Sequence, residues 1–281
     1  MEKRSDAQIY ELAYKKVPYG FWDDKLYTPL QCGSADSKDD VCQLKDNTGD
    51  NISDKNYFYS ETTGTYWIWK NAHHTDYVGQ CQYRRRLQFK EDYDFKSMFS
   101  KYKMIINRPI FLNLRLKQQM MLCHPQIDVK AFESIVYEKA PSYASTFNDI
   151  FNNGHILFFS SSYVTTWNLF DDYCNFMFPI LDEYFNRFEF INRERLKGYV
   201  SRKMTHEMKS RPVEYHMLIG GFLQERLFTA WVLNNFQQDQ IYYQDFVFME
   251  EAAGLKSMTR QSAERRAARA NRIAEKIISK S

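Results

Sequence analysis

The stretch from Asn51 to Phe89, NISDKNYFYSETTGTYWIWKNAHHTDYVGQCQYRRRLQF, decides the fold of this chain. Ser53 is a good N-cap for a helix over residues 54–71, where aromatic and apolar side chains recur at helical spacing. A short loop leads to residues 76–82, DYVGQCQ, whose small and apolar side chains predict a strand. Tyr83 and three consecutive arginines end the pattern. A helix that leads into a strand is typical of α/β proteins, so this class is the first expectation.

The same two periodicities recur along the rest of the chain. Further strands are expected over residues 102–107, 156–165 and 241–248, with residues 8–13 as a strand or a short helix. Helices are expected over residues 130–139, 141–151, 167–188 and 214–234, the last interrupted or begun at a Gly-Gly pair. Strands separated by helices predict one α/β domain over residues 1–250.

The composition argues against several classes of protein. The net charge of +3 is too small to indicate general nucleic-acid binding, so we expect no nucleic-acid partner. The five cysteines are widely spread and form no C-x-x-C pair, which is typical of reduced cytosolic cysteine and not of a zinc site or a disulfide framework. No run of about 18 apolar residues predicts a membrane-spanning helix. The first ten residues lack the apolar core of a secretory leader, so we expect a cytoplasmic protein.

The charge is concentrated in a tail over residues 251–281. From residue 252 onward there are eight Lys/Arg and two Glu, which gives +6 and leaves −3 for the rest of the net +3. Alanines form one face of the expected helix, and cations line the other through Arg265, Arg269, Arg272 and Lys276. A basic amphipathic helix can lie on an anionic membrane, which predicts a protein peripheral to the inner face of the plasma membrane. The alternative is a solvated tail.

Arg84 and Arg85 follow the strand over residues 76–82, where ligands of open α/β sheets bind, beyond the carboxyl ends of the strands. Guanidinium groups match phosphate oxygens and are always charged, so they can neutralise a diphosphate leaving group. The alternative is a solvated cluster that pairs with the acidic side chains of residues 91–94.

Three acidic features are candidates for chemistry. Asp92-Tyr93-Asp94 has the D-x-D spacing that can hold Mn²⁺ or Mg²⁺ through carboxylate oxygens, although it lies several residues past the strand and such a triplet is common by chance. Glu225 lies in an apolar helix, either as a base or as an ion-pair partner of Arg226. Asp128, four residues after a histidine, is a second candidate base.

Three groups of residues form longer ordered motifs. The first group is Asp50-Asn51-Ile52-Ser53, Lys55-Asn56, Tyr59-Ser60-Glu61, Thr63, Tyr66-Trp67, Trp69-Lys70-Asn71, Tyr77, Gly79 and Tyr83-Arg84-Arg85. The others are Phe170-Asp171-Asp172-Tyr173-Cys174 and Gly221-Phe222-Leu223 with Glu225-Arg226-Leu227. Together they resemble a bacterial family long catalogued as a domain of unknown function, which occurs in capsule, exopolysaccharide and O-antigen gene clusters and is counted among the glycosyltransferases. The resemblance spans most of residues 8–235.

The chain departs from the family pattern at three positions. Gln82 stands where the family usually has histidine, Tyr14 stands where an early histidine is usual, and Ser161 replaces an asparagine. Roles that depend on those side chains are therefore not carried over. Gln82 and Ser161 favour the alternative of a non-catalytic carbohydrate-binding or scaffold protein that keeps the fold.

The resemblance implies a GT-A-like, Rossmann-type mixed sheet and a transferase that uses a nucleoside-diphosphate sugar, with UDP expected and galactofuranose as the sugar of some members. The acceptor would be a polysaccharide or a lipid-linked oligosaccharide. Arginine charge would replace the metal ion, so no cofactor is expected, and Glu225 and Asp128 are the candidate bases. The residues expected to bind the donor are Arg84, Arg85, Tyr83, Asn51, Lys55, Asn56, Glu61, Trp67, Trp69 and Lys70.

Overall fold

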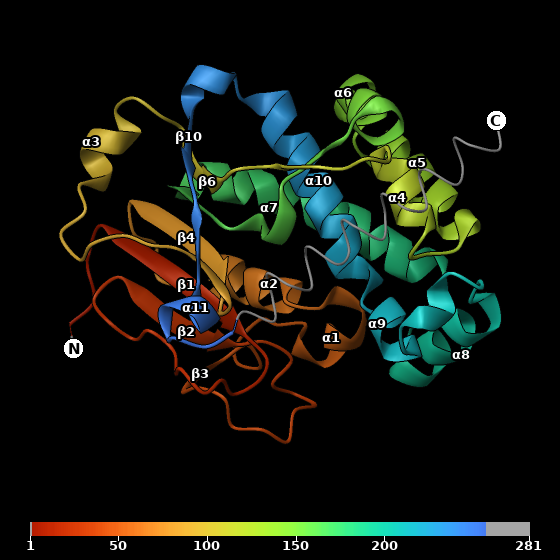
Figure 1. Ribbon diagram of the computed structural model, residues 1–281, viewed down its shortest axis with the longest axis horizontal. Helices are drawn as coiled ribbons and strands as arrows, with labels where there is room; N and C mark the ends of the chain where they lie inside the picture. The colour runs from red at the N-terminus through yellow and green to blue at the C-terminus, as the bar shows by residue number, and fades with distance from the viewer. Residues whose placement is uncertain (1, 257–281) are drawn as a thin grey trace.

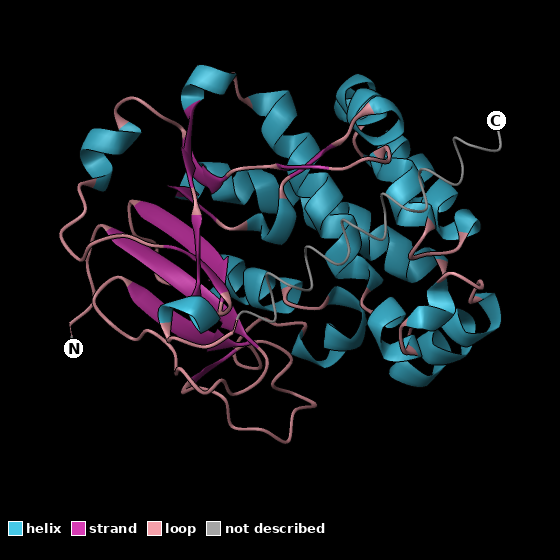
Figure 2. Cartoon of the chain, viewed as in Figure 1, coloured by secondary structure: helices cyan, strands magenta, loops and turns pink. Residues whose placement is uncertain are grey.

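The computed structural model describes residues 2–256, and its centre is a mixed sheet flanked by helices (Figures 1 and 2). The main strand order is β10-β6-β9-β4-β1-β2-β3, and β5 joins β4 to β11. Strand β1 pairs in parallel with both β2 and β4, whereas β9 runs antiparallel to β4 and β6. The expected α/β class with a mixed Rossmann-type sheet is confirmed.

The strands are short except for the two at the centre. Their bounds are β1 Ala7–Ala13, β2 Tyr27–Gln31, β3 Leu44–Lys45, β4 Tyr77–Gln82, β5 Arg85–Leu87, β6 Met104–Asn107, β9 Tyr163–Thr166, β10 Ile241–Gln244 and β11 Phe246–Phe248. A separate ribbon pairs β7 Ile110–Phe111 with β8 Ile156–Leu157.

The longest helix, α7, covers Trp167–Arg187, and the next, α10, covers Ile219–Asn235. The other α-helices are α1 Asn56–Tyr59, α2 Thr62–Asn71, α3 Phe95–Phe99, α4 Leu116–Met121, α5 Gln126–Lys139, α6 Ala144–Asn148, α8 Arg193–Lys203, α9 Val213–Met217 and α11 Met249–Ala252. Short turns of helix lie at Ser53–Lys55, Pro141–Tyr143, Asp149–Asn153, Phe159–Ser161, Met208–Ser210 and Gln238–Gln240. No helix within residues 2–256 is long and apolar enough to cross a bilayer.

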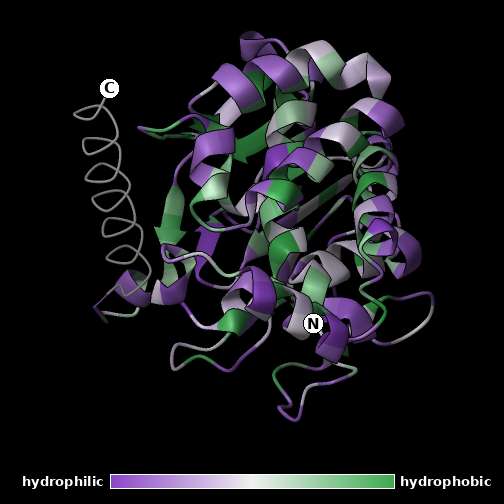
Figure 3. Ribbon diagram, turned by 90° about the vertical axis from the view of Figure 1, so that its right-hand side faces the viewer, coloured by the Kyte–Doolittle hydropathy of each residue, from purple (hydrophilic) through white to green (hydrophobic). Residues whose placement is uncertain are grey.

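The two faces of the sheet bury different cores. Successive strand residues point to opposite faces, so Tyr10 and Leu12 of β1 join the large core formed with α2, α7 and α10. Ile9 points the other way and packs with Tyr27 and Phe95 in a smaller core. Because both faces are covered, every residue of β1 is buried. In Figure 3 the hydrophobic residues are concentrated along the inner strands and helices, and the outer loops are mostly hydrophilic.

The prediction of one continuous helix over residues 54–71 is wrong. The segment forms a helical turn, α1 and α2, because Ser60 takes a left-handed φ of 56° between the two α-helices. Ser53 makes no cap, since its hydroxyl donates to the buried carboxylate of Asp46 at 2.5 Å. The same carboxylate accepts the backbone N–H groups of Gly33 and Ser34, so it fixes the loop before β3 to the start of α1.

Two other expected elements are divided in the structure. The strand over residues 156–165 is β8, a helical turn and β9, because Ser160 and Ser161 both have positive φ. The helix over residues 214–234 is α9 and α10, which separate at Leu218. Residues 8–13 are confirmed as strand. Strand β2, helix α8 and the short elements β3, β5, α3 and α4 were not expected from the sequence.

Candidate functional site

The carboxyl ends of β1 and β4 form the switch point of the sheet. The chain continues from β1 to β2 on one side and reaches β4 on the other, so the connections diverge between the two parallel strands. Ligands of open α/β sheets bind at such a point. Tyr14 follows β1 there, and Tyr83 and Arg84 follow β4.

The first part of the site is a cluster of tyrosines around Arg84. The rings of Tyr14 and Tyr83 meet edge to face with their centroids 5.5 Å apart. The Arg84 Nε donates to the Tyr83 hydroxyl at 2.8 Å, and a terminal nitrogen donates to the Tyr14 hydroxyl at 3.2 Å. The Tyr83 ring is buried at 3% exposure, and Tyr14 is 52% exposed. The cluster therefore holds a guanidinium group beside an exposed aromatic ring.

Arg85 lies in the second part of the site. Its terminal nitrogen donates to the Gln82 side-chain oxygen at 3.1 Å and to the Ser160 hydroxyl, and its guanidinium lies 4.4 Å from the centre of the Phe159 ring. Residues on β4, β5 and the helical turn at Phe159–Ser161 thus hold this cation at the sheet edge.

Two carboxylates complete this group. The Gln82 amide donates to Glu61 at 2.5 Å, and the Ser160 hydroxyl reaches the Gln82 oxygen at 3.3 Å. The backbone N–H of Ser160 donates to Glu225 at 3.1 Å. We call these five residues, Glu61, Gln82, Arg85, Ser160 and Glu225, the β4 network. Because they come from five separate segments of the chain, only the folded structure brings them together.

Backbone strain is concentrated around the β4 network. Ser60, Ser160 and Ser161 all have positive φ, at 56°, 71° and 43°. Such conformations cost a residue with a Cβ about 1–3 kcal/mol and tend to persist at functional sites. Ser60 immediately precedes Glu61, and Ser160 holds both Arg85 and Glu225, so the strained positions present the charged groups of the network.

Glu225 is an unusual carboxylate within the network. Its side chain is 13% exposed, and its second oxygen accepts from Arg226 at 3.1 Å. Burial raises its pKa above the ordinary value and the negative charge of Glu61 raises it further, against the lowering effect of Arg226 and of the Ser160 N–H. A carboxyl with a raised pKa suits proton transfer near neutral pH.

The third arginine does not belong to the site. Arg86 is fully buried and pairs with Glu11 of β1, and its guanidinium lies 3.7 Å from the centre of the Trp22 ring. Neighbouring strand residues point to opposite faces, so Arg85 reaches the β4 network and Arg86 reaches the other side of the sheet.

The aromatic motif residues make structural contacts. The Trp67 ring donates to the Thr48 carbonyl and hydroxyl at 3.1 and 2.9 Å. The Trp69 ring donates to Asp171 at 2.7 Å and stacks on Phe178 of α7. Lys70 lies over the Trp69 ring, with its nitrogen 3.2 Å from the ring centre. These contacts attach α2 to α7 and to the preceding loop.

The polar motif residues also make local contacts. Asn51 bonds to the backbone of Gly49 and Ser53, and Lys55 lies over the ring of Phe185. The Asn56 amide donates to the Ser60 carbonyl at 2.6 Å, so it supports the strained turn before Glu61. Among the expected donor-binding residues, the structure brings Glu61 and Arg85 into the β4 network and places Tyr83 and Arg84 beside it.

Asp128 is located elsewhere. It is buried on α5 and accepts a hydrogen bond from Tyr199 of α8, and burial raises its pKa to about 6. Within residues 2–256, no hydrogen bond or ion pair joins Asp128 to the β4 network. His124, four residues earlier, packs its ring on Phe222 and is also buried.

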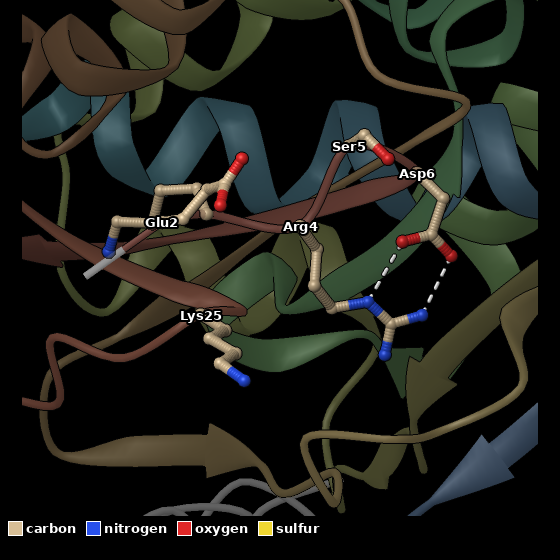
Figure 4. A pocket seen from close by; sticks show the side chains of 6 residues that line it. Glu2, Arg4, Ser5, Asp6 and Lys25 are labelled. Atoms are coloured by element: carbon tan, nitrogen blue, oxygen red, sulfur yellow. Dashed lines mark hydrogen bonds and ion pairs between the residues drawn. The ribbon is translucent and has the colours of Figure 1, made fainter.

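The D-x-D triplet lies at the other end of the sheet. Asp94 caps α3 through the Ser97 N–H, and the charges of Asp92 and Asp94 act on Arg4, which precedes β1. Figure 4 shows an open depression at this amino end, where Arg4 points to Asp6 through two hydrogen bonds. Its lining residues are Glu2, Lys3, Arg4, Ser5, Asp6 and Lys25. In the part of the chain that the structure describes, no group of three or more His, Cys, Asp or Glu side chains is placed to hold a metal ion.

Sequence reasoning missed Ser160 and treated Gln82 only as a departure from a motif. The sequence Ser160-Ser161-Ser162 does not predict that two of its residues adopt positive φ, because serine has no strong preference for the positive-φ region. The tail cations Arg265, Arg269, Arg272 and Lys276 lie outside the described residues.

This arrangement, an α/β sheet with arginines and carboxylates at its switch point, defines a Rossmann-type, GT-A-like fold. A family model described as a domain of unknown function (DUF4422) matches residues 8–207, and the chain belongs to that family. A solved structure titled as the apo form of a WbbM bifunctional glycosyltransferase matches with a TM-score of 0.65 and 24% identity. The match covers 86% of this chain and 45% of that one, so this chain corresponds to less than half of that protein. No curated protein matches.

Proposed function

We propose that this chain is a glycosyltransferase that moves a sugar from a nucleoside-diphosphate donor to a polysaccharide or lipid-linked oligosaccharide acceptor. UDP is the nucleotide that we expect in the donor. The observation that carries the proposal is the juxtaposition of Arg85 with two carboxylates, Glu61 and Glu225, beyond the carboxyl end of β4, with Arg84 next to it in the chain. The GT-A-like fold and the glycosyltransferase title of the structural neighbour support it.

The donor's diphosphate would lie against Arg84 and Arg85. When the sugar departs, negative charge grows on the leaving phosphate oxygen, and fixed cations at that point stabilise the transition state. Arg85 donates to the Gln82 amide oxygen and to the Ser160 hydroxyl, which hold it at the end of β4. The exposed ring of Tyr14 offers a stacking surface for the nucleobase.

The acceptor hydroxyl must lose a proton during an inverting transfer, and a carboxylate of the site is the natural base. Of the two bases expected from the sequence, Glu225 lies in the β4 network beside Glu61, whereas Asp128 would have to act from its separate location on α5. We further propose that the reaction needs no metal ion, because arginine charge is present where the diphosphate would lie. Loss of activity with EDTA and recovery with Mn²⁺ or Mg²⁺ would contradict that step and return Asp92 and Asp94 to consideration.

The central experiment is Arg85→Ala in a transfer assay. Loss of one charge-stabilising donor costs up to about 3 kcal/mol of transition-state stabilisation, which is about a hundredfold in turnover. Arg187→Ala is the matched control, because Arg187 is an arginine on α7 whose ion pairs are exposed. The donor is first identified by thermal-shift screening with UDP-, GDP- and dTDP-sugars, UDP-galactofuranose among them. Unchanged turnover in Arg85→Ala removes this residue from the reaction.

The second candidate function is a non-catalytic carbohydrate-binding or scaffold protein that retains the fold. Gln82 and Ser161, which depart from the family pattern, favour it, and Gln82 lies at the centre of the β4 network. A protein that binds glycans but neither transfers nor hydrolyses any sugar nucleotide would establish this alternative.

We also propose that the chain works in capsule, exopolysaccharide or O-antigen synthesis at the inner face of the plasma membrane. The support is the basic sequence of the tail, through Arg265, Arg269, Arg272 and Lys276. Deletion of residues 257–281 should weaken binding to anionic liposomes and leave binding to neutral liposomes unchanged. Equal binding by both forms of the protein contradicts the membrane proposal.

A further inference from the structure

We propose that Glu61 is the catalytic base that takes the proton of the acceptor hydroxyl, and that Glu225 is a positioning residue held beside it. The inference rests on the proposed transferase function and assigns the two carboxylates of the β4 network different tasks. It starts from how the fold presents each of them.

The chain presents Glu61 through a strained turn. Ser60 has φ 56° and ψ −141°, so the backbone reverses between α1 and α2 and Glu61 precedes the first turn of α2. The Gln82 amide fixes one carboxylate oxygen at 2.5 Å, and the Ser60 hydroxyl bonds the other. Asn56 holds the Ser60 carbonyl from behind. Several contacts therefore aim this carboxylate at the end of β4.

Gly221 brings α10 against this turn. A Cβ at position 221 would lie 3.0 Å from the Ser60 Cβ and 3.8 Å from a carboxylate oxygen of Glu61. Only a residue without a side chain lets the α10 backbone approach so closely. Glu225 is four residues later and therefore on the same face of α10. The glycine thus places the second carboxylate next to the first, and the charge of Glu61 accordingly acts on Glu225.

Both carboxylate oxygens of Glu225 are engaged by its partners. One oxygen accepts the Ser160 N–H and the other accepts Arg226, whose side chain is 1% exposed. Arg226 in turn donates to the Phe222 carbonyl and to Gln119. The charge of Glu225 is the counter-charge of this buried guanidinium, so taking up a proton would disrupt the ion pair. Glu225 instead fixes the strained Ser160 and, through it, Arg85.

Glu61 has no such restriction. Within residues 2–256 no ion pair joins it, and its partners are an amide and a hydroxyl. The Ser60 hydroxyl can donate to the carboxylate and can accept from the carboxylic acid, so it accommodates both protonation states.

The reaction balances with these groups alone. The acceptor oxygen forms a bond to the anomeric carbon while its proton passes to Glu61. The bond between the anomeric carbon and the diphosphate oxygen breaks, and its electron pair stays on the departing nucleoside diphosphate, opposite Arg84 and Arg85. Glu61 then returns the proton to solvent.

The test compares Glu61→Gln with Glu225→Gln, using the sugar nucleotide found by screening. Removal of a general base lowers turnover by about a hundredfold or more. We expect this loss in kcat for Glu61→Gln, with donor affinity and the unfolding midpoint unchanged. Glu61→Asp, which keeps a shorter base, should retain part of the activity. Glu91→Gln is the control, because Glu91 is exposed at the other end of the sheet.

Azide provides a readout that a structural role would not change. Azide ion attacks the anomeric carbon without losing a proton and yields a glycosyl azide and the nucleoside diphosphate. Added azide should therefore restore donor consumption in Glu61→Gln. Wild-type turnover in Glu61→Gln, or azide rescue confined to Glu225→Gln, overturns the assignment. If the wild-type protein neither binds nor consumes any sugar nucleotide, the proposed function itself fails, and this inference fails with it.

Discussion

Replacing Arg86 by methionine should destabilise the fold far more than replacing an exposed arginine. The Arg86 Nε lies 3.0 Å from one oxygen of Glu11, a terminal nitrogen contacts the other oxygen, and both side chains are 0% exposed. The backbone N–H of Trp22 also donates to the Glu11 carboxylate at 3.1 Å. Methionine fills similar space but leaves a carboxylate in the interior without its cation.

The size of the effect follows from that burial. Breaking a buried pair by removing one partner costs about 3–5 kcal/mol, and each kcal/mol lowers the unfolding midpoint of a chain of this size by roughly 2–4 °C. Arg187→Met is the control, since its partner Glu138 is 48% exposed and such pairs contribute about 0–1 kcal/mol. Urea unfolding of both variants measures the difference. Equal losses would refute the reasoning.

The dependence on pH tests the mechanism of the loss. Burial already raises the pKa of Glu11 against the lowering effect of Arg86, and removal of Arg86 raises it further. A carboxyl whose pKa is higher in the folded state than in the unfolded state loses stability as pH rises between the two values. The deficit of Arg86→Met should therefore shrink on acidification, by about 1.4 kcal/mol per pH unit between the pKa of Glu11 in the folded variant and its lower pKa in the folded wild type. A deficit independent of pH, or no recovery in the double variant with Glu11→Gln, would contradict this account.

Three further predictions concern other parts of the fold. Ser160→Gly should maintain or raise the unfolding temperature, because glycine tolerates φ 71°. The same change should lower transfer activity, because the contact between the Ser160 hydroxyl and Arg85 is lost. A lower unfolding temperature with normal activity would contradict this prediction. Gly220→Ala should lower the free energy of unfolding by about 1–3 kcal/mol, since the new Cβ would lie 2.7 Å from the Phe58 carbonyl oxygen. An unchanged free energy of unfolding in urea would show that α10 can shift. Asp128 has a pKa raised to about 6, so wild-type stability should fall as pH rises from about 4 to 6, by up to about 3 kcal/mol. Asp128→Asn should flatten that slope and leave transfer unchanged if Asp128 is structural, whereas lost transfer would support it as a base.

The sequence predicted the layers of the fold better than its details. Buried strands such as β4 and long helices such as α7 follow from apolar periodicity, and both lie close to the expected residues. Strand β2 was missed because Pro29 and the preceding glycine and proline suggested a loop. The proline is tolerated because β2 pairs on its other side with the two-residue strand β3 alone, so few hydrogen bonds are lost.

The breaks in the elements could not be predicted for a different reason. Ser60 and Ser160 adopt positive φ where side chains hold their backbone, through Asn56 four residues earlier in one case and through Glu225 of α10 in the other. The conformational propensity of a short stretch of sequence does not predict such contacts. The same limit applies to the motif residues that were expected to bind the donor. A motif shows that residues belong together, but Trp67, Trp69 and Lys70 belong together because they attach α2 to its neighbours.

In the arginine triplet, two neighbouring residues differ in role: Arg86 is structural and Arg85 is proposed to be chemical. Strand side chains alternate between faces, so Arg85 and Arg86 diverge however similar they are in sequence. On one face, Arg85 donates to Gln82 and Ser160 of the β4 network. On the other face, Arg86 finds Glu11 from β1 and becomes part of the core. Tyr83 and Arg84 lie in the turn before β5 and set which arginine faces which side. Inserting or deleting one residue in that turn would exchange the faces, with Arg86 then pointing to the site and Arg85 toward Glu11, so the turn constrains the fold and the chemistry together.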